Sequence, residues 1–558
     1  MIYNSLKRFP LLLLVVFFFT LCTSISFSQS RGIKNLKERG AVWIPDNGNG
    51  TYTNPIIQAD YSDPDAIRVG DDYYITSSSF SHFPGLPILH SKDLVNWKII
   101  SHAVPNYPLP EFNSTQPGNG IWAPAIRFHK GEFYIYVGDP DNGIFMTKAK
   151  NPHGPWEPFQ LIRKAKGWID PCPFWDEDGN AYLIHAWARS RSGIKHVITV
   201  NKMSADGKSI LDDGVQVFCD SINHNTMEGP KVYKRNGFYY IFAPAGGVKP
   251  GWQTILRSKN IYGPYEAKIV LEQGSTKING PHQGAWVQTQ AGEDWFIHFQ
   301  DRYAYGRIIH LQPMRWENDW PVMGEDYDKN GIGEPVTTFK KPNVGKKYSV
   351  CVPQTNDEFS ESKLGLQWQW QSNYSSDWIS LTAKKGWLRF YSQPYLNNTK
   401  NIYMASALLM QKFPAPSFET VTKVELNSSM VDAKAGIIIF GYDYARVGIM
   451  KTLDGYKAFQ SVCTNAEKGT EEKNISEKDV SISKVYLKAS VSESFSEHGT
   501  PIAKCTFSFS EDGKSFQQIG NEFVAKEGRW VGAKIGLFSE SSNQAKSSFA
   551  DFDWFRFK

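Results

Sequence analysis

The chain has 558 residues, with 61 lysines and arginines against 56 aspartates and glutamates, so its formal net charge is only +5. That length exceeds one ordinary hydrophobic core and predicts two or three domains. The small positive excess is spread without basic runs, which argues against binding to nucleic acids or membrane surfaces.

The first 28 residues have the pattern of a secretory signal peptide. Lys7 and Arg8 precede an apolar run from Leu11 to Leu21, and the small polar residues that follow predict cleavage after Ser28. The run is short for a membrane span, and no later segment approaches the roughly 18 apolar residues that a span needs. We therefore expect an exported protein, periplasmic or extracellular, without a membrane span; its oligomeric state is open.

Five related phrases follow between residues 40 and 340. Each joins a marker proline to an aromatic-rich strand, and the markers are Pro64, Pro124, Pro171, Pro230 and Pro281. Their spacings of 60, 47, 59 and 51 residues lie near the repeat lengths of propeller blades. Apolar spacing typical of helices is not sustained in this stretch. The segment 40–340 is therefore predicted to form a five-bladed β-propeller.

Carboxylates stand at or beside three of these markers. Asp63 and Asp170 immediately precede their prolines, and Glu228 lies two residues before Pro230. Because the innermost strands of a propeller surround one axis, we expect the three acids to converge on a central pocket. Any single Asp-Pro pair is a common turn opener. Three like charges in one cavity, however, raise one another's pKa and cost stability, so the set indicates catalysis.

The second half of the chain has a different texture. After a polar linker predicted over 341–356, strands of period two appear, for example at 386–391 and 435–440. The segment 357–558 is thus predicted to be a β-sandwich of jelly-roll type, which makes the whole protein all-β. Its first and last strands are expected to pair, bringing 357–359 near 551–555, where acidic side chains suggest a calcium site. Three tryptophans are candidate sugar-stacking residues: Trp368, Trp370 and Trp378. The alternative is that they are buried strand residues.

The order of the motifs resembles glycoside hydrolase family 43. The segments Asn54-Pro55-Ile56, Ser62-Asp63-Pro64-Asp65 and Val69-Gly70-Asp71-Asp72-Tyr73-Tyr74 are similar to the family's opening, and Trp122-Ala123-Pro124, Asp170-Pro171 and Glu228-Gly229-Pro230 follow in its order. The trailing sandwich looks like the concanavalin A-like domain of the β-xylosidase and α-L-arabinofuranosidase branches. The chain departs from the family at Ser62, where a proline often precedes the aspartate.

Carried over to this sequence, the resemblance implies three catalytic roles. Asp63 would be the general base that activates water, Glu228 the general acid that protonates the leaving oxygen, and Asp170 the residue that tunes and orients that acid. An inverting glycosidase needs two carboxyls about 6.5–9.5 Å apart, one ionised and one protonated. Other acids of the first repeat are expected on a rim loop, on the opposite face or in a hairpin turn: Asp60, Asp65 and Asp72.

The resemblance also implies residues around the sugar. Arg307 matches an arginine that contacts the sugar or the acids, and Phe80 and Trp122 match the walls of the sugar subsite. Trp530 is expected to reach the pocket from the sandwich. His282 matches a histidine near a central calcium, often contacted through water, so a structural calcium is expected while the chemistry itself requires no cofactor. The alternatives are a merely solubilising arginine, inter-blade packing of the aromatic rings and a hydrogen-bonded core histidine.

These features favour an exo-acting, inverting glycoside hydrolase that releases terminal β-D-xylose or α-L-arabinofuranose from plant cell-wall oligosaccharides or polysaccharides. The motifs do not separate the two sugars. The same fold also acts on arabinan from within the chain or on galactan, and both remain open. A secreted, non-catalytic sugar-binding propeller or a scaffold for protein partners are further alternatives, although neither would need three acids at matching blade positions.

Overall fold

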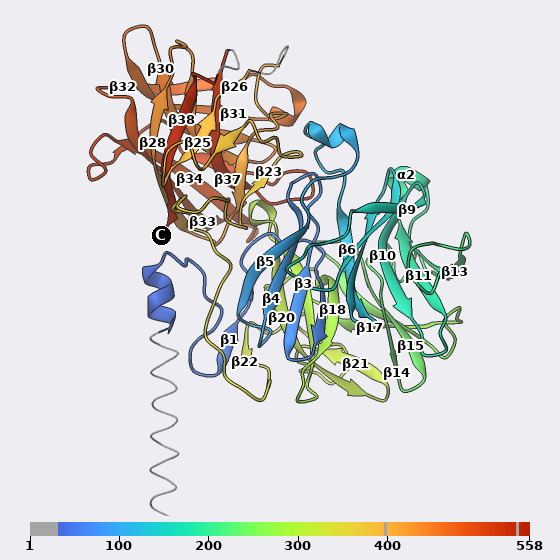
Figure 1. Ribbon diagram of the computed structural model, residues 1–558. Coiled ribbons are helices and arrows are strands. Elements are labelled where there is room, and N and C mark those ends of the chain that lie inside the picture. The colour runs from blue at the N-terminus through green and yellow to red at the C-terminus, as the bar shows by residue number, and fades with distance from the viewer. Residues whose placement is uncertain (1–31, 396–398, 543–545) are drawn as a thin grey trace, which may run out of the picture.

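The computed structural model of the protein describes residues 32–395, 399–542 and 546–558. The predicted signal peptide lies outside them, so export stays a prediction. Two β-domains stand side by side, the propeller and the sandwich, as predicted (Figure 1). Residues 32–38 form a short helix, and α2 (Arg189–Ser192), η1 (Pro110–Asn113), η2 (Tyr303–Tyr305) and η3 (Ala466–Lys468) are single turns. No helix in these ranges is long and apolar enough to cross a membrane.

The propeller consists, in the described part of the chain, of five four-stranded antiparallel blades whose strands follow chain order. The first two blades contain β2 (Asp65–Val69), β3 (Asp72–Thr76), β4 (Gly85–Ser91) and β5 (Trp97–Val104), then β6 (Trp122–His129), β7 (Glu132–Asp139), β8 (Gly143–Ala149) and β9 (Gln160–Lys164). The third contains β10 (Trp168–Trp175), β11 (Ala181–Trp187), β12 (Val197–Met203) and β13 (Val215–Cys219). The last two contain β14 (Lys231–Arg235), β15 (Phe238–Ala245), β16 (Trp252–Ser258) and β17 (Glu266–Leu271), then β18 (His282–Gln288), β19 (Asp294–Asp301), β20 (Arg307–Glu317) and β21 (Trp320–Met323).

The same strained turn opens the innermost strand of every blade. The residue before each marker proline has a positive φ: 53° at Asp63, 25° at Ala123, 56° at Asp170, 61° at Gly229 and 46° at Gly280. Residues with a side chain rarely adopt such angles. Strand pairing also shifts register at this point in the second, third and fifth blades. The turn therefore places residues 63 and 170 at equivalent points around the axis.

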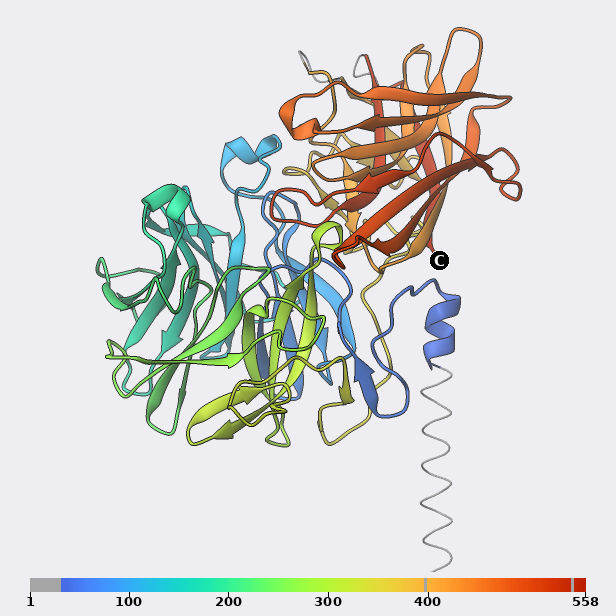
Figure 2. The same cartoon turned by 180° about the vertical axis from the view of Figure 1, so that it is seen from behind.

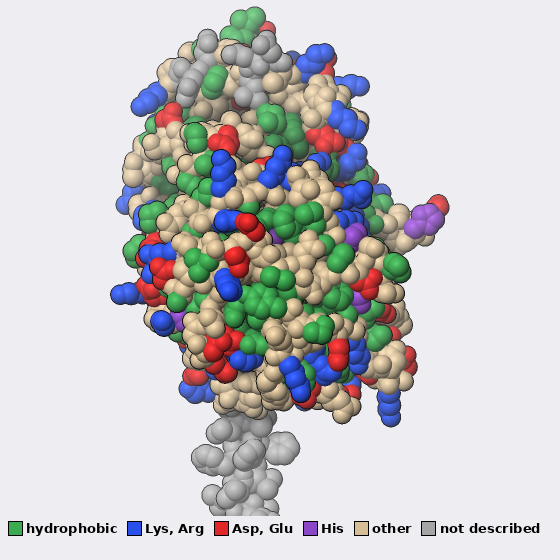
Figure 3. Space-filling view, turned by 90° about the vertical axis from the view of Figure 1, so that its right-hand side faces the viewer, with side chains coloured by type: hydrophobic (Ala, Val, Ile, Leu, Met, Phe, Trp, Pro, Cys, Tyr) green, Lys and Arg blue, Asp and Glu red, His purple; other side chains and the backbone are tan. Residues whose placement is uncertain are grey.

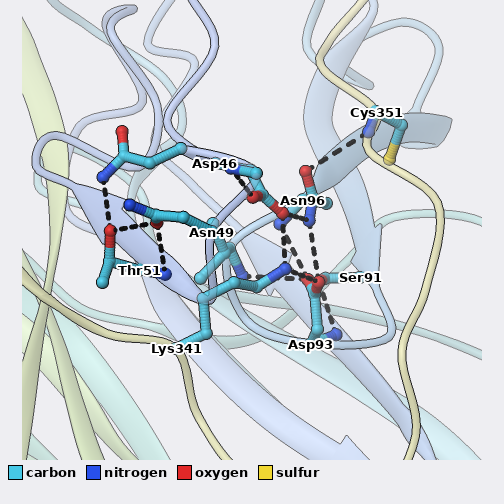
Figure 4. A network of polar contacts seen from close by, with 11 residues as sticks. Asp46, Asn49, Thr51, Ser91, Asp93, Asn96, Lys341 and Cys351 are labelled. Carbon is cyan, nitrogen blue, oxygen red and sulfur yellow. Dashed lines mark hydrogen bonds and ion pairs between the residues drawn. The ribbon is translucent and has the colours of Figure 1, made fainter. Parts of the chain in front are cut away.

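In the described part of the chain, each blade consists of four consecutive strands, so no blade combines strands from the two ends of the propeller segment. Instead, β1 (Thr51–Thr53) pairs with β22 (Thr338–Lys340), one before the first blade and one after the last. A polar network strengthens this closure (Figure 4). Lys341 Nζ lies 2.5 Å from Asp46 Oδ2 and 2.8 Å from Asp93 Oδ2, and Asn96 Nδ2 donates to both acids. The amide of Cys351 donates to Asn96 Oδ1, so the network fastens the entering segment, the first blade and the chain that leaves.

The C-terminal domain comprises, over its described residues, two eight-stranded sheets. One has the order β23 (Gln369–Trp370), β27 (Leu409–Lys412), β37 (Lys534–Ser541), β29 (Lys434–Phe440), β30 (Tyr444–Lys451), β31 (Tyr456–Cys463), β32 (Lys473–Val480), with β26 (Gln393–Pro394) beside β37. The other has the order β24 (Ile379–Ser380), β25 (Leu388–Tyr391), β38 (Phe549–Phe557), β28 (Phe418–Asn427), β33 (Lys484–Phe495), β34 (Pro501–Ser510), β35 (Gln517–Gln518), with β36 (Phe523–Ala525) beside β34.

The sandwich core contains all three tryptophans that the sequence offered as sugar-stacking residues. Trp368 and Trp370 are each 2% exposed and Trp378 is 9% exposed. They are therefore core residues and not an exposed binding platform, and all three pack in the hydrophobic core of the sandwich. Asp357 pairs with Phe555, so the two ends of the domain do lie together.

The two domains share one packed interface. Tyr305 of η2 is 1% exposed and belongs to the sandwich core, where its hydroxyl donates to the carbonyl of Pro416. Phe83 and Trp370 exchange two backbone hydrogen bonds. Seen from behind, loops of the sandwich lie on one end of the propeller (Figure 2). The face in Figure 3 carries acidic and basic side chains interspersed, without a continuous basic surface there.

Candidate active site

The three acids singled out in the sequence lie together. Asp63 precedes β2, Asp170 lies in β10, and Glu228 stands just before β14. Burial raises the pKa of the Asp170 carboxyl, and the negative charges of Glu228 and Asp63 raise it further, so Asp170 lies within electrostatic reach of both acids. The strained turns at the heads of the blades thus bring residues 165 positions apart in sequence to one site.

Asp63 is held by three side chains. Its Oδ2 accepts hydrogen bonds from the hydroxyls of Ser62 and Ser78, at 2.7 and 2.6 Å, and its Oδ1 accepts one from Nη1 of Arg307 at 2.9 Å. Burial lowers the pKa of Arg307, but the charge of Asp63, followed by those of Asp301 and Asp60, more than offsets this and raises it. A charge-assisted contact of this kind fixes a carboxylate in position.

Asp170 is buried and bonded to the backbone turn of the next blade. Its Oδ2 accepts from the amide of Gly229 at 2.7 Å and from Nε2 of Gln283 at 3.1 Å. Only 3% of the residue is exposed. Asp170 therefore cannot contact a substrate as freely as its neighbour Glu228.

Glu228 is the accessible acid of the three. Its side chain is 27% exposed, against 7% for Asp63. Its Oε1 lies 3.3 Å from Nε2 of His282, and that histidine is fully buried against Phe299. Glu228 can thus turn its free oxygen to a substrate while His282 and Asp170 border it from behind.

A calcium ion bound directly by His282 does not fit these donors. Calcium takes oxygen ligands, and the ring of His282 offers nitrogen. Throughout the described ranges no three His, Cys, Asp or Glu side chains gather to hold a metal. The acids at the ends of the sandwich already have cationic partners, since Asp551 pairs with Arg389 and Asp553 with Lys423. A calcium contacted through water remains a prediction from the resemblance alone.

A row of aromatic rings borders the acids. Phe80 and Trp122 meet edge to face at 6.2 Å, and Trp122 meets Trp530 of the sandwich in the same way at 6.0 Å. Phe80 is only 3% exposed and is bonded through its backbone to Ile121, so it acts mainly in packing. Trp530 is 45% exposed, which leaves its ring free at the rim.

Two rival acids of the first repeat lie elsewhere. Asp65 is fully buried and pairs with Arg127 of the second blade at 2.6 Å. Asp72 lies in a hairpin turn, 2.5 Å from His90 and 2.6 Å from Lys92. Neither reaches the group formed by Asp63, Asp170 and Glu228.

Sequence reasoning missed three polar residues of the site. Ser62 occupies the place where the family often has proline, and its hydroxyl both donates to Asp63 and accepts from Arg307. Ser78 bonds Asp63 and also accepts the amide of Ala123 from the next blade. Gln283 bonds Asp170. Only Ser62 carried a signal, because it was noted as a departure from the family pattern.

The arrangement provides two outer acids in different environments beside one buried acid. One is fixed by an arginine and two hydroxyls, and the other is accessible and bordered by a buried carboxyl whose pKa is raised. Environments that separate the protonation behaviour of two carboxyls are characteristic of acid–base catalysis.

Comparison with known proteins identifies both domains. The family described as Glycosyl hydrolases family 43 matches residues 52–321, and the Beta xylosidase C-terminal Concanavalin A-like domain matches residues 356–558. A protein of Xylanibacter ruminicola named as a putative β-xylosidase is 43% identical over 88% of this chain and 87% of its own length. A β-xylosidase of Formosa agariphila is 33% identical over 92% and 91% of the two chains.

A non-reducing end α-L-arabinofuranosidase of Bacteroides ovatus is also similar, at 28% identity over 91% of this chain and 95% of its own. Among solved structures, a variant of a family 43 protein of Bacillus licheniformis superposes with a TM-score of 0.76 at 27% identity, covering 91% of this chain and 99% of that one. The similarity thus spans both domains.

Proposed function

The chain belongs to family 43 of the glycosyl hydrolases and is therefore a glycoside hydrolase, and we propose that it removes terminal pentose, β-D-xylose or α-L-arabinofuranose, with inversion at the anomeric carbon. The names of the similar proteins include both activities. The observation that carries the proposal is the difference between the two outer acids: Asp63 is fixed by Arg307, whereas the side chain of Glu228 is partly exposed.

In the proposed reaction Asp63 accepts a proton from a water molecule as that water attacks the anomeric carbon. Glu228 donates its proton to the glycosidic oxygen as the bond to the leaving sugar breaks. Asp170, held by the amide of Gly229, lies beside Glu228 and orients that acid. Arg307 and the hydroxyls of Ser62 and Ser78 keep the base aimed at the water.

The first test is hydrolysis of 4-nitrophenyl β-D-xylopyranoside and 4-nitrophenyl α-L-arabinofuranoside by the mature protein. We expect release from at least one substrate, and a loss of kcat of about 10²-fold or more in Glu228→Gln, because this removes the proton donor. Glu177→Gln is the matched control, since that glutamate is 88% exposed and contacts Lys234 away from the pocket. Proton NMR of the first product formed distinguishes inversion from retention.

Retention of the anomeric configuration would contradict the proposed roles of the two acids. Absence of hydrolysis of both substrates in a folded protein would contradict the pentosidase proposal and favour another glycoside, such as galactan or internal arabinan bonds.

A further inference from the structure

One buried acid of the site has no place in the chemistry described above. Asp60 is 3% exposed, and both of its oxygens accept backbone hydrogen bonds. Oδ1 accepts the amide of Arg307, and Oδ2 accepts the amide of Gly532 in the sandwich, each at 2.9 Å. A single carboxylate thus joins the arginine that holds Asp63 to a loop of the other domain.

The loop that reaches Asp60 carries Trp530. This loop, residues 528–533, is closed by a hydrogen bond from the amide of Gly528 to the carbonyl of Val531, and the amide of Ala533 donates to Ala304 just before Arg307. Trp530 stands two residues before the bond to Asp60 and meets Trp122 at the rim. The position of the ring therefore depends on the same short segment that Asp60 holds.

The backbone around Asp60 is packed too closely to move independently. A Cβ on Gly306 would lie 2.5 Å from Cγ of Asp60, and a Cβ on Gly532 would lie 2.6 Å from the amide nitrogen of Gly306. Gly306 also has a φ of 72°, which disfavours any side chain. Both glycines are needed for the propeller turn and the sandwich loop to approach one another across the carboxylate.

We propose that Asp60 is a positioning residue that sets, in one contact, the place of Arg307 beside the base Asp63 and the place of Trp530 at the rim. The inference rests on the proposed function for its kinetic consequences, but its structural part stands without it. The sandwich then serves the chemistry directly, because its loop supplies one of the two partners of Asp60.

The test is Asp60→Asn, which keeps the shape of the side chain but turns one acceptor into a donor that faces a backbone N–H. We expect kcat to fall by about 10- to 100-fold on aryl pentosides, because small displacements of catalytic groups have effects of this size. We also expect KM to rise, by the same amount that we expect for replacement of the ring itself in Trp530→Ala. In the double variant Asp60→Asn with Trp530→Ala, the KM effect should be less than the product of the single effects.

The matched control is Asp93→Asn. Asp93 is 2% exposed and accepts the amides of Val95 and Asn96, but it belongs to the network around Lys341 and contacts no residue of the site. We expect Asp93→Asn to lower the Tm without changing kcat or KM. The parent enzyme must be active for this comparison. If Asp60→Asn then lowers the Tm but leaves kcat and KM unchanged, as expected for Asp93→Asn, the proposal is wrong.

A second variant serves if Asp60→Asn does not fold. Gly532→Ala inserts a methyl group against the backbone of Gly306 and should reproduce the same kinetic change. Gly528→Ala in the same loop is its control, because the nearest atom to a Cβ there is a side-chain methyl of Val531 at 3.0 Å. Equal kcat and KM in both glycine variants would overturn the proposal.

A crystal structure of Asp60→Asn gives a readout that needs no substrate. We expect the contact between Arg307 Nη1 and Asp63 Oδ1 to open beyond hydrogen-bond distance, or the loop 528–533 to move away from Trp122. If both stay as they are here, Asp60 does not position them, whatever glycoside the enzyme cleaves.

Discussion

Asp170 is deeply buried beside the negatively charged Glu228. Because the ionised form of Asp170 is unfavourable there, the free energy of unfolding should depend on pH. Burial first, and then the charge of Glu228, raises the pKa of Asp170 to about 8, well above its ordinary value of 3.8. The folded protein therefore binds a proton that the unfolded chain releases between pH 4 and 8. The stability contributed by this group is complete below pH 4 and is lost as the pH rises towards 8.

Asp170→Asn removes this titration. We expect the variant to be more stable than the parent at pH 8, by about 1–2 kcal/mol in the free energy of unfolding, with a smaller difference at pH 5. The new amide can pair with Gln283, because Oε1 of that side chain has no other partner among the described residues. Thermal unfolding at the two pH values measures the difference, and activity should fall because the carboxyl that the Gly229 amide holds beside Glu228 is changed. If the gain in stability of the variant over the parent is smaller at pH 8 than at pH 5, this assignment is wrong.

At the scale of single residues, the sequence predicted which acids matter better than how they are held. Asp63, Asp170 and Glu228 were found because they stand at matching points of a repeat. Ser78 and Gln283 were not, since each bonds an acid from a different blade and no local pattern marks such a contact. Asp60 was assigned to a rim loop, whereas it lies buried between domains.

The element most open to test is the sandwich loop 528–533 with its tryptophan. Trp530 has a φ of 66°, so the loop holds a large side chain in a backbone conformation that costs free energy unless its surroundings fix it. Its ring is the exposed member of the row that begins at Phe80. We expect Trp530→Ala to raise KM by about 5- to 10-fold with a small change in kcat, as expected for loss of an aromatic contact worth about 1 kcal/mol.

The measurement is steady-state kinetics on both aryl pentosides, with Trp554→Ala as the control. Trp554 lies in β38 near Tyr486 and contacts neither Trp122 nor the acids. An unchanged KM in Trp530→Ala would show that its ring does not contact the substrate.

The strands and blades could be predicted from the sequence because the residues that mark them, aromatic runs and marker prolines, lie close together in the chain. Aromatic runs such as 238–242 fall within β15, and the marker prolines fall at the heads of the innermost strands or within them. The positive φ at the residue before each marker did not follow, since Ala123 carries no signal for it and Asp or Gly before proline is common in ordinary turns as well. The burial of Trp368, Trp370 and Trp378 likewise depends on tertiary packing, because only Trp370 lies in a strand and no local pattern marks the other two.

At the scale of the whole molecule, the interface between the domains contains two neighbouring lysines. Lys412 and Lys534 stand opposite one another on β27 and β37, and Lys534 is 3% exposed. Burial, and then the charge of Lys412, lowers the pKa of Lys534 to about 7, while Asp60 acts in the opposite direction. The folded state thus disfavours the charged form, so stability rises as the pH increases from about 7 to 10.5.

Lys534→Met should therefore stabilise the protein at pH 7 and below, by about 1–2 kcal/mol, because it removes a charge that is costly to bury. The gain should shrink towards pH 10, where the lysine of the folded parent is already neutral. Differential scanning calorimetry at pH 6 and pH 10 makes the comparison, and Lys478→Met on the exposed strand β32 is the control. A gain that is equal at both pH values would contradict a charge-based origin.

The turn that precedes every marker proline gives the molecule a rotational pseudo-symmetry that its chemistry does not share. Five backbone positions around one axis are nearly interchangeable, yet Asp occupies two of them, Ala123 one, and glycine the remaining two, with Glu228 just before one glycine. The asymmetry of the pocket, and with it the orientation in which a sugar must enter, therefore resides in a few side chains on a repeated frame. An acid moved alone to another blade would lose the partners that hold it, because Arg307, Ser78 and Gln283 are not repeated around the axis.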